Sequence, residues 1–229
     1  MSVPPEPEYR PPPPEALKLN HADEDLFVAN KPAGLLSVPG RGSHKSASVL
    51  SYLSELYGPV FDVHRLDLDT SGLMIVARSQ LAQSTLAQQF ADRKITKTYY
   101  ALVRGQMAGV SGEIDLPIGR DWNERPLRRI DHDAGKPSKT LWWLEKQGEM
   151  NAHLRLQPVT GRTHQLRVHL ASIGHPILGD RLYDSGCSSG RLYLHAGRLD
   201  FEHPTTGKPV HFLSVRPFDP QGATADTRL

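Results

Sequence analysis

Four side chains that could take part in acid-base or nucleophilic chemistry lie close together in the stretch VHRLDLDTSGLMIVA, residues 63–77. They are His64, Arg65, Asp67 and Asp69, and five apolar residues end the stretch. Carboxylates act as nucleophiles or as general acids and bases, and catalytic residues gather in loops held by rigid elements. Taken alone, the stretch leaves two interpretations equally open: a reactive aspartate, or a solvated turn in which Arg65 pairs with an aspartate.

A second cluster of such residues lies in VTGRTHQLRVHLASIGHPILGDRLY, residues 159–183. It brings Arg162, His164, Gln165, Arg167 and His169 to the start of a predicted helix. A carboxylate sequestered at the entrance of a strand is costly unless a cation from elsewhere in the fold compensates it. Arg167 is therefore the candidate partner of Asp67.

Composition is that of an ordinary soluble globular protein, with 229 residues, 38% hydrophobic and 23% charged. A net charge of +2 permits binding to nucleic acid without demanding it. The single cysteine, Cys187, has no partner for an internal disulfide, and no apolar run resembles a signal peptide or a membrane span. We therefore expect a cytoplasmic protein with no membrane partner.

The two ends of the chain differ from the segment between them. Residues 1–17 contain seven prolines and almost no large aliphatic residues, which predicts a disordered, proline-rich arm. Residues 219–229 are predicted to form a flexible tail. Without repeats or a convincing linker, residues 18–218 are predicted to form one catalytic domain.

Periodicity predicts a mixture of strands and helices that does not alternate regularly. Helical spacing, Ser or Gly-Pro boundaries and apolar faces predict helices near residues 48–57, 80–92 and 163–172. Alternating or continuous apolar residues predict strands near residues 25–30, 72–77, 97–105, 138–144, 152–158, 192–201 and 209–215. This arrangement favours an α+β fold with a mixed, mainly antiparallel sheet flanked by helices.

Three long motifs in this order resemble those of the RluA family of pseudouridine synthases. They are HRLDLDTSG, KTYYALVRG and GRTHQLRVHLASIGHPILGDRLY, beginning at residues 64, 97 and 161. Two shorter segments, NKPAGLLSVPGR from residue 30 and LYLHA from residue 192, are also similar. The resemblance extends over about residues 23–218 and implies the catalytic domain of a pseudouridine synthase.

The resemblance implies isomerisation of uridine in RNA, in which the base leaves C1′, rotates and rejoins through C5. It implies no cofactor and no metal. The family's essential aspartate matches Asp67, which would attack C1′ or C6 or assist a glycal route, and the residues do not choose among these. Arg167 matches the charge partner of that aspartate, and Tyr99 matches an aromatic residue that stacks on the base.

Further residues are assigned to substrate binding, each with a structural alternative. Arg65 matches the position that would fill the gap left by a flipped-out nucleotide, although it could instead pair with Asp69. Leu194 resembles an apolar residue under the uracil, although burial is the ordinary reading of a strand leucine. His64, Arg162 and His164 complete the substrate-binding set, and the last two could instead only pack.

Basic residues near these motifs could bind phosphate groups of RNA, interleaved with Tyr99, Tyr100 and Trp122. They are Arg93, Lys94, Lys97, Arg104, Arg120, Arg125, Arg128, Arg129, Lys136 and Lys139. Acidic residues between 121 and 133 dilute the run, so a solvated loop remains the alternative.

Rival functions have weaker support. His164 and His169 suggest a metallohydrolase, but their spacing of five does not align two ligands on one helix face. Asp67 and Asp69 lie too close together to flank a glycosidic bond. A non-catalytic RNA-binding or ribosome-associated protein of the same fold remains the alternative to an enzyme.

The RNA target is the least determined property. The chain most resembles the compact branch without an S4 RNA-binding domain, which implies a tRNA anticodon stem-loop, a loop of large-subunit rRNA, or both. We further expect the protein to be a monomer.

Overall fold

The computed structural model describes residues 8–187 and 190–218, which separate into two compact units. One consists of residues 98–194, and the other of residues 8–97 together with residues from 195 onward. We call them the Arg167 unit and the Asp67 unit, after the predicted catalytic residue that each contains. The prediction of one catalytic domain over residues 18–218 stays a prediction.

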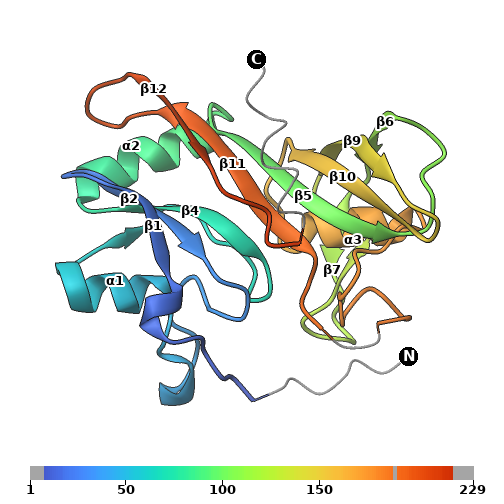
Figure 1. Cartoon of the computed structure of the whole chain (residues 1–229), viewed down its shortest axis with the longest axis horizontal. Helices are drawn as coiled ribbons and strands as arrows, with labels where there is room; N and C mark the ends of the chain where they lie inside the picture. The colour runs from blue at the N-terminus through green and yellow to red at the C-terminus, as the bar shows by residue number, and fades with distance from the viewer. Residues whose placement is uncertain (1–7, 188–189, 219–229) are drawn as a thin grey trace. The chain divides into compact units, whose positions relative to one another are not determined.

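The Asp67 unit contains a mixed sheet in the order β1-β2-β4-β11, with β12 paired to β11 and β3 paired to β4 (Figure 1). Among the described strands of this unit, β4 and β11 pair in parallel, whereas the pairs β1–β2, β2–β4, β3–β4 and β11–β12 are antiparallel. The strands are β1 (Lys18–Ala22), β2 (Leu26–Lys31), β3 (Phe61–Asp62), β4 (Ser71–Ala77), β11 (Leu194–Glu202) and β12 (Pro209–Leu213). The helices are α1 (Val49–Tyr57) and α2 (Gln80–Ala91).

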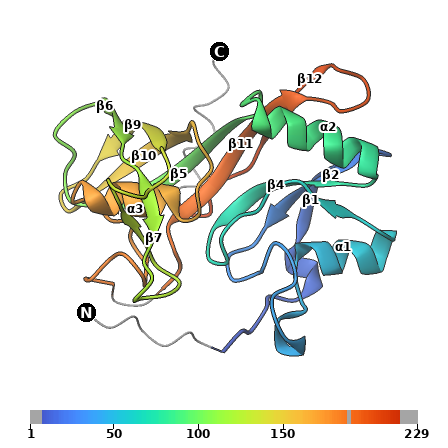
Figure 2. The same cartoon turned by 180° about the vertical axis from the view of Figure 1, so that it is seen from behind.

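Strand β4 is buried along its whole length because helices cover both faces of the sheet around it (Figure 2). Ile75 belongs to the same core cluster as Leu86 of α2. On the other face, the ring of Phe27 from β2 lies 4.9 Å from the ring of Tyr57 in α1. Alternate residues of a strand face opposite sides, so the continuous apolar sequence of β4 follows from this double cover.

The Arg167 unit contains an antiparallel sheet in the order β5-β10-β9-β6 and a separate two-stranded hairpin. Its sheet strands are β5 (Thr96–Arg104), β6 (Ser111–Asp115), β9 (Lys139–Gln147) and β10 (Asn151–Pro158). The hairpin is formed by β7 (Ile118–Arg120) and β8 (Arg128–Ile130). Helix α3 (Gln165–Ser172) packs Leu166 and Leu170 against Leu154 and Leu156 of β10.

The predicted fold class, an α+β fold with a mixed and mainly antiparallel sheet, is confirmed. The three predicted helices and seven predicted strands all occur, with ends that differ by a few residues. Strands β1, β3, β6, β7 and β8 were not predicted. They are short or polar, and β1 (KLNHA) contains little apolar sequence on either face.

Part of the predicted disordered arm contacts the rest of the Asp67 unit. The Tyr9 hydroxyl donates to the carbonyl of Ala47 at 2.7 Å, and the Tyr52 hydroxyl donates to the carbonyl of Pro12 at 2.9 Å. Two tyrosine hydroxyls thus connect residues 8–17 to α1 and the segment before it, and the disorder of the arm stays a prediction. Residues 1–7 and the predicted tail, 219–229, lie outside the described residues.

Candidate active site

Asp67 opens a tight turn that leads into β4. Its carbonyl accepts a hydrogen bond from the backbone N–H of Thr70 at 3.1 Å, and β4 begins at the next residue. Asp67 is half-buried, whereas Thr70 is buried. The sequence correctly placed the carboxylate at the entrance of a buried strand.

The buried side chain of Lys31 forms hydrogen bonds to the backbone of this turn and of the loop after β2. This side chain is completely buried, and Nζ donates to the carbonyls of Leu35 at 2.6 Å, Leu68 at 2.9 Å and Pro32 at 3.2 Å. Burial lowers the pKa of Lys31 to about 7, although the negative charges of Asp67 and Asp69 oppose that shift. Lys31 thus joins the loop after β2 to the Asp67 turn.

The loop after β2 makes further contacts with the Asp67 turn. The Ser37 hydroxyl donates to the carbonyl of Leu66 at 2.8 Å and accepts from its N–H at 3.0 Å. The N–H of Gly34 donates to the carbonyl of Leu68 at 3.0 Å. Backbone groups on both sides of Asp67 are therefore fixed, which is what a carboxylate needs to keep one orientation.

The His64 ring makes contacts within the Asp67 unit. Its Nε2 accepts a hydrogen bond from the N–H of Ile75 at 2.9 Å, and its ring centroid lies 4.7 Å from that of Phe90. Burial, with a smaller effect of Lys97, lowers the pKa of His64 to about 3. A neutral ring that accepts a hydrogen bond from β4 explains this residue without a substrate, and the substrate-binding role of His64 stays a prediction.

Arg65, in contrast, is exposed. Among residues 8–187 and 190–218, the structure gives its side chain no hydrogen bond or ion pair, so the alternative of a salt bridge with Asp69 is not found. An exposed guanidinium two residues before Asp67 is available to RNA, and the role of filling a vacated stack stays a prediction.

The start of β4 is fixed by polar contacts and by a glycine. The Ser71 hydroxyl lies 2.9 Å from Nδ1 of His195, and Nε2 of His195 lies 3.0 Å from the hydroxyl of Ser214. Gly72 has φ +114°, and a Cβ there would lie 2.2 Å from the backbone oxygen of Ala196. Only glycine allows β4 and β11 to approach this closely.

Arg167 forms a buried bidentate ion pair that was not predicted. Its Nε and Nη2 donate to the two carboxylate oxygens of Asp180, each at 2.7 Å, and the side chains are 5% and 0% exposed. The N–H groups of Leu182 and Tyr183 also donate to Asp180. The predicted pairing of Arg167 with Asp67 stays a prediction, whereas Asp180 orients the guanidinium within its own unit.

His164 and Arg162 precede α3 and differ in exposure. His164 has φ +57°, and its Nδ1 lies 2.7 Å from the hydroxyl of Tyr183, whose ring also lies 5.1 Å from the guanidinium carbon of Arg167. Arg162 is exposed, and its Nε is 3.4 Å from the carbonyl of Pro137. His164 is thus built into the surroundings of Arg167, while Arg162 reaches solvent where RNA could contact it.

Tyr99 and Leu194 belong to the core of the Arg167 unit to different degrees. Tyr99 is half-buried and packs against the core cluster, and it pairs with Leu156 in the β5–β10 ladder. Leu194 is 3% exposed and lies within that cluster. Burial explains Leu194 without a substrate, and stacking of Tyr99 on a base stays a prediction.

The histidines proposed as metal ligands have internal partners. Nε2 of His169 lies 3.0 Å from the carbonyl of Leu116 and Nδ1 lies 2.9 Å from the hydroxyl of Thr140, so both nitrogens are used. In the described part of the chain, one group, Asp23, Asp25 and His203, brings potential ligand atoms within 4.8 Å of one another. Nδ1 of His203 faces two backbone N–H groups, which leaves the proton on Nε2 to bind Asp23 and disfavours a metal there.

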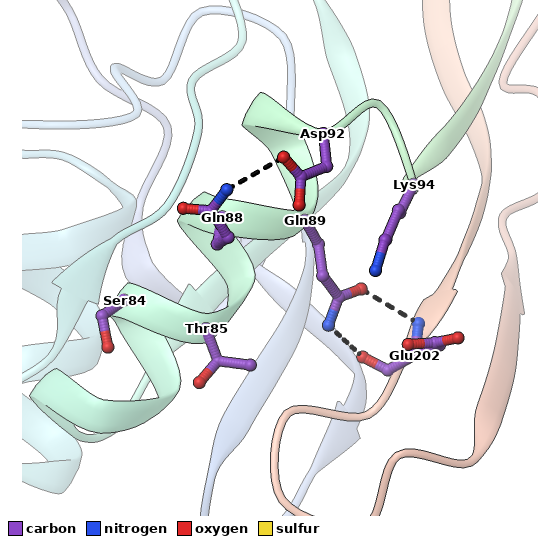
Figure 3. Close-up of a pocket in the computed structure, with 7 residues that line it drawn as sticks. All are labelled: Ser84, Thr85, Gln88, Gln89, Asp92, Lys94 and Glu202. Atoms are coloured by element: carbon purple, nitrogen blue, oxygen red, sulfur yellow. Dashed lines mark hydrogen bonds between the residues drawn. The ribbon is translucent and has the colours of Figure 1, made fainter.

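A polar pocket beside α2 involves other residues. There the side-chain amide of Gln89 donates to the carbonyl of Glu202 at 2.8 Å and accepts from its N–H at 3.1 Å, with Asp92 and Lys94 alongside (Figure 3). None of the predicted catalytic residues lines this pocket, and of the basic residues predicted to bind phosphate, Lys94 does.

Two solved structures show which class of protein has this fold. The human protein RNA Pseudouridylate Synthase Domain Containing 1 matches with a TM-score of 0.77 and 30% identity, over 93% of this chain and 90% of that chain. Human RNA Pseudouridylate Synthase Domain Containing 4 matches with a TM-score of 0.72 at 23% identity, over 92% and 93% of the two chains, and supports the fold alone. The fold is that of the pseudouridylate synthases.

Sequence comparison gives the family. Residues 25–172 match the family model described as RNA pseudouridylate synthase. The dual-specificity RNA pseudouridine synthase RluA of Vibrio parahaemolyticus is 45% identical over 205 residues, 86% of this chain and 82% of the relative. Its namesake from Escherichia coli K12 is 40% identical over 214 residues, 92% and 98% of the two chains. The chain belongs to the RNA pseudouridylate synthase family and is an enzyme that isomerises uridine in RNA.

The structure adds one observation about membranes. Within the described residues, no helix is long and apolar enough to cross a bilayer.

Proposed function

We propose that this enzyme converts specific uridines to pseudouridine in structured RNA, with Asp67 as its catalytic carboxylate. The observation that carries the assignment is the rigid mount of Asp67, on a turn whose backbone is held by Lys31 and Ser37. A carboxylate held in one orientation can approach one atom of a bound nucleotide.

In the proposed reaction, the N1–C1′ bond of the uridine breaks, the uracil rotates, and a new C5–C1′ bond forms. The hydrogen on C5 passes to water and N1 takes up a proton, so the product is an isomer of the substrate. Asp67 acts by attack on C1′ or C6 or by assisting a glycal route. Arg167, oriented by Asp180, is the charge partner, and the Tyr99 ring stacks on the base.

A uridine in a stem or a structured loop has to leave its stack before these groups can reach it. We propose that Arg65 occupies the vacated space, because its exposed guanidinium is free of protein partners among the described residues. Arg162 is the candidate for a contact with the flanking phosphate.

The proposed targets are a tRNA anticodon stem-loop and a loop of large-subunit rRNA. Support comes from the motifs GLLSVPGR and GHPILGDRLY and from relatives at 40–45% identity whose names describe dual specificity. Such RNAs would place the enzyme in the cytoplasm, and we propose a monomer that requires no metal or cofactor.

The decisive experiment compares Asp67→Asn with the wild-type enzyme on RNA tritiated at C5 of uridine. We expect the variant to fold and to bind RNA but to release no tritium, because an amide cannot replace an ionised carboxylate. Asp69→Asn, two residues away, serves as the matched control and should retain measurable turnover. Release of tritium by Asp67→Asn at the wild-type rate would remove Asp67 from the reaction.

The targets are tested separately by chemical mapping of pseudouridine, because isomerisation leaves the mass of the RNA unchanged. Mapping of tRNA and rRNA from cells with and without this protein should show modified uridines that depend on it. If the maps of tRNA and of rRNA are each the same in cells with and without the protein, the proposed targets are contradicted.

A further inference from the structure

The loop between β7 and β8 presents a large aromatic side chain to solvent. Trp122 is 64% exposed, and the guanidinium carbons of Arg120 and Arg125 lie 5.5 and 5.3 Å from its ring. Within residues 8–187 and 190–218, neither arginine is given an ion pair or a side-chain hydrogen bond. Both guanidinium groups therefore lie near the same ring, and among the described residues neither forms an ion pair with a carboxylate.

The backbone on either side of Trp122 is fixed. The N–H of Asp121 donates to the carbonyl of Leu127 at 3.1 Å, which closes the loop. The Asp121 carboxylate accepts from the N–H groups of Asn123 at 3.0 Å and Glu124 at 3.2 Å. An aromatic side chain on a preorganised loop loses less conformational entropy on binding than one on a flexible loop.

The hairpin is attached to the cluster around Arg167. The N–H of Arg128, in β8, donates to the Tyr183 hydroxyl at 2.9 Å. The Tyr183 ring lies against Arg167, and its hydroxyl also contacts His164. The hairpin that carries the Trp122 loop is therefore bonded to Tyr183, whose ring also contacts Arg167, the predicted charge partner, within the same unit.

We propose that Trp122 stacks on an unpaired base of the RNA substrate other than the modified uridine, while Arg120 and Arg125 bind the phosphates beside that base. This inference rests on the proposed function, because it assigns a second contact to the same RNA. Planar bases stack on exposed aromatic rings irrespective of sequence, and two guanidinium groups near the ring suit the charged backbone of a single-stranded loop.

Binding of an anticodon stem-loop RNA tests the stacking. In an Asp67→Asn background, which prevents turnover, Trp122→Ala should raise the Kd by about five- to 150-fold, the range that loss of one stacked base predicts. Trp122→Phe should retain most of the affinity. With Asp67 intact, the same loss should appear in Trp122→Ala as a higher KM for RNA, since Trp122 is not placed at the reacting atoms.

An abasic scan identifies the stacked base. Each unpaired nucleotide of the stem-loop is replaced in turn by an abasic one, and the Kd is measured for the protein that retains Trp122 and for the Trp122→Ala variant. We expect one position at which the abasic substitution weakens binding to the first protein and has little effect on binding to the second. Equal effects at every position in both proteins would overturn the inference.

The arginines are tested by the salt dependence of binding. Arg120→Gln and Arg125→Gln should each reduce the slope of log K against log salt by about one phosphate contact. Arg155→Gln is the matched control, because Arg155 lies 4.2 Å over Trp143 in a cation–π pair on the sheet. A slope that changes equally in all three variants would contradict a specific role of the Trp122 loop.

The inference and the proposed function can fail separately. If the wild-type protein forms no pseudouridine in any RNA, the proposed function fails. If it forms pseudouridine normally and Trp122→Ala binds the stem-loop as tightly as the wild type, only the stacking inference is overturned.

Discussion

The ammonium group of Lys31 donates a hydrogen bond to the carbonyl of Leu68, the residue after Asp67, at 2.9 Å. The two partners are 37 residues apart in the sequence, and the Lys31 side chain is fully buried. A buried lysine costs free energy unless its donors are used, and here Nζ has three carbonyl acceptors. This arrangement is consistent with a need to hold the Asp67 turn in one conformation.

Replacement of this lysine should therefore impair catalysis more than RNA binding. We expect Lys31→Met to lower kcat by about 10- to 100-fold with little change in KM for RNA, because a displaced carboxylate loses its alignment. Single-turnover rates at saturating RNA measure this effect. Lys18→Met, at an exposed position on β1, should behave as the wild type; a rise in KM without a loss of kcat for Lys31→Met would contradict this role of Lys31.

The approach of β4 to β11 gives a second prediction. Gly72→Ala should destabilise the protein by more than about 3 kcal/mol, because the new Cβ meets backbone atoms of Ala196 in addition to the strain of a positive φ. Gly58→Ala is the control, since Gly58 has φ +83° and no heavy atom within 4 Å of an added Cβ. Gly58→Ala should lower the free energy of unfolding by only about 1–2 kcal/mol. Urea unfolding compares the two variants, and equal losses would show that β4 can shift away from β11.

The elements that the sequence predicted well are those specified by local pattern. Helix α1 begins after Ser48, whose side chain accepts from the N–H of Ser51, and ends at Gly58 with a positive φ. Strand β4 was recognisable because its residues are apolar on both faces. Such signals depend on residues a few positions apart, so one sequence is enough to read them.

The polar contacts of the candidate site depend on tertiary structure, and the sequence did not determine them. Asp180 and Asp67 were both available as acids for Arg167, and nothing in their spacing ranks one above the other. The one available signal was that Asp180 lies in the same long motif, 13 residues after Arg167. Similarly, the sequence could not show that His64 would accept a hydrogen bond from the N–H of Ile75, since that contact depends on how the turn folds back on β4.

The Arg167–Asp180 pair should contribute strongly to stability. Asp180→Asn removes a carboxylate that accepts two hydrogen bonds from a guanidinium only 5% exposed, and loss of one partner of a buried pair costs about 3–5 kcal/mol. Asp184→Asn is a matched control, because Asp184 is similarly buried but its partner Arg104 is 44% exposed and can be hydrated. Chemical denaturation of both variants should show the larger loss for Asp180→Asn. A larger loss for Asp184→Asn would contradict the burial of Arg167.

The contact between His64 and Ile75 predicts how stability depends on pH. The pKa of His64 is about 3 in the folded protein and about 6.5 in an unfolded chain, so between these values the unfolded state binds more protons. The stabilisation from neutral His64 is therefore complete above about pH 6.5 and is lost as the pH falls toward 3. His64→Phe keeps an aromatic ring against Phe90 but cannot accept from Ile75.

The variant should be less stable at pH 7 by about 1–3 kcal/mol, because a buried N–H loses its acceptor. Its deficit relative to the wild type should shrink on acidification, since only the wild type loses free energy by protonation of His64. Urea unfolding of both proteins at about pH 7 and about pH 4.5, on either side of the unfolded-state pKa, measures the difference. A deficit that stays constant between the two pH values would mean that His64 does not remain neutral in the folded state.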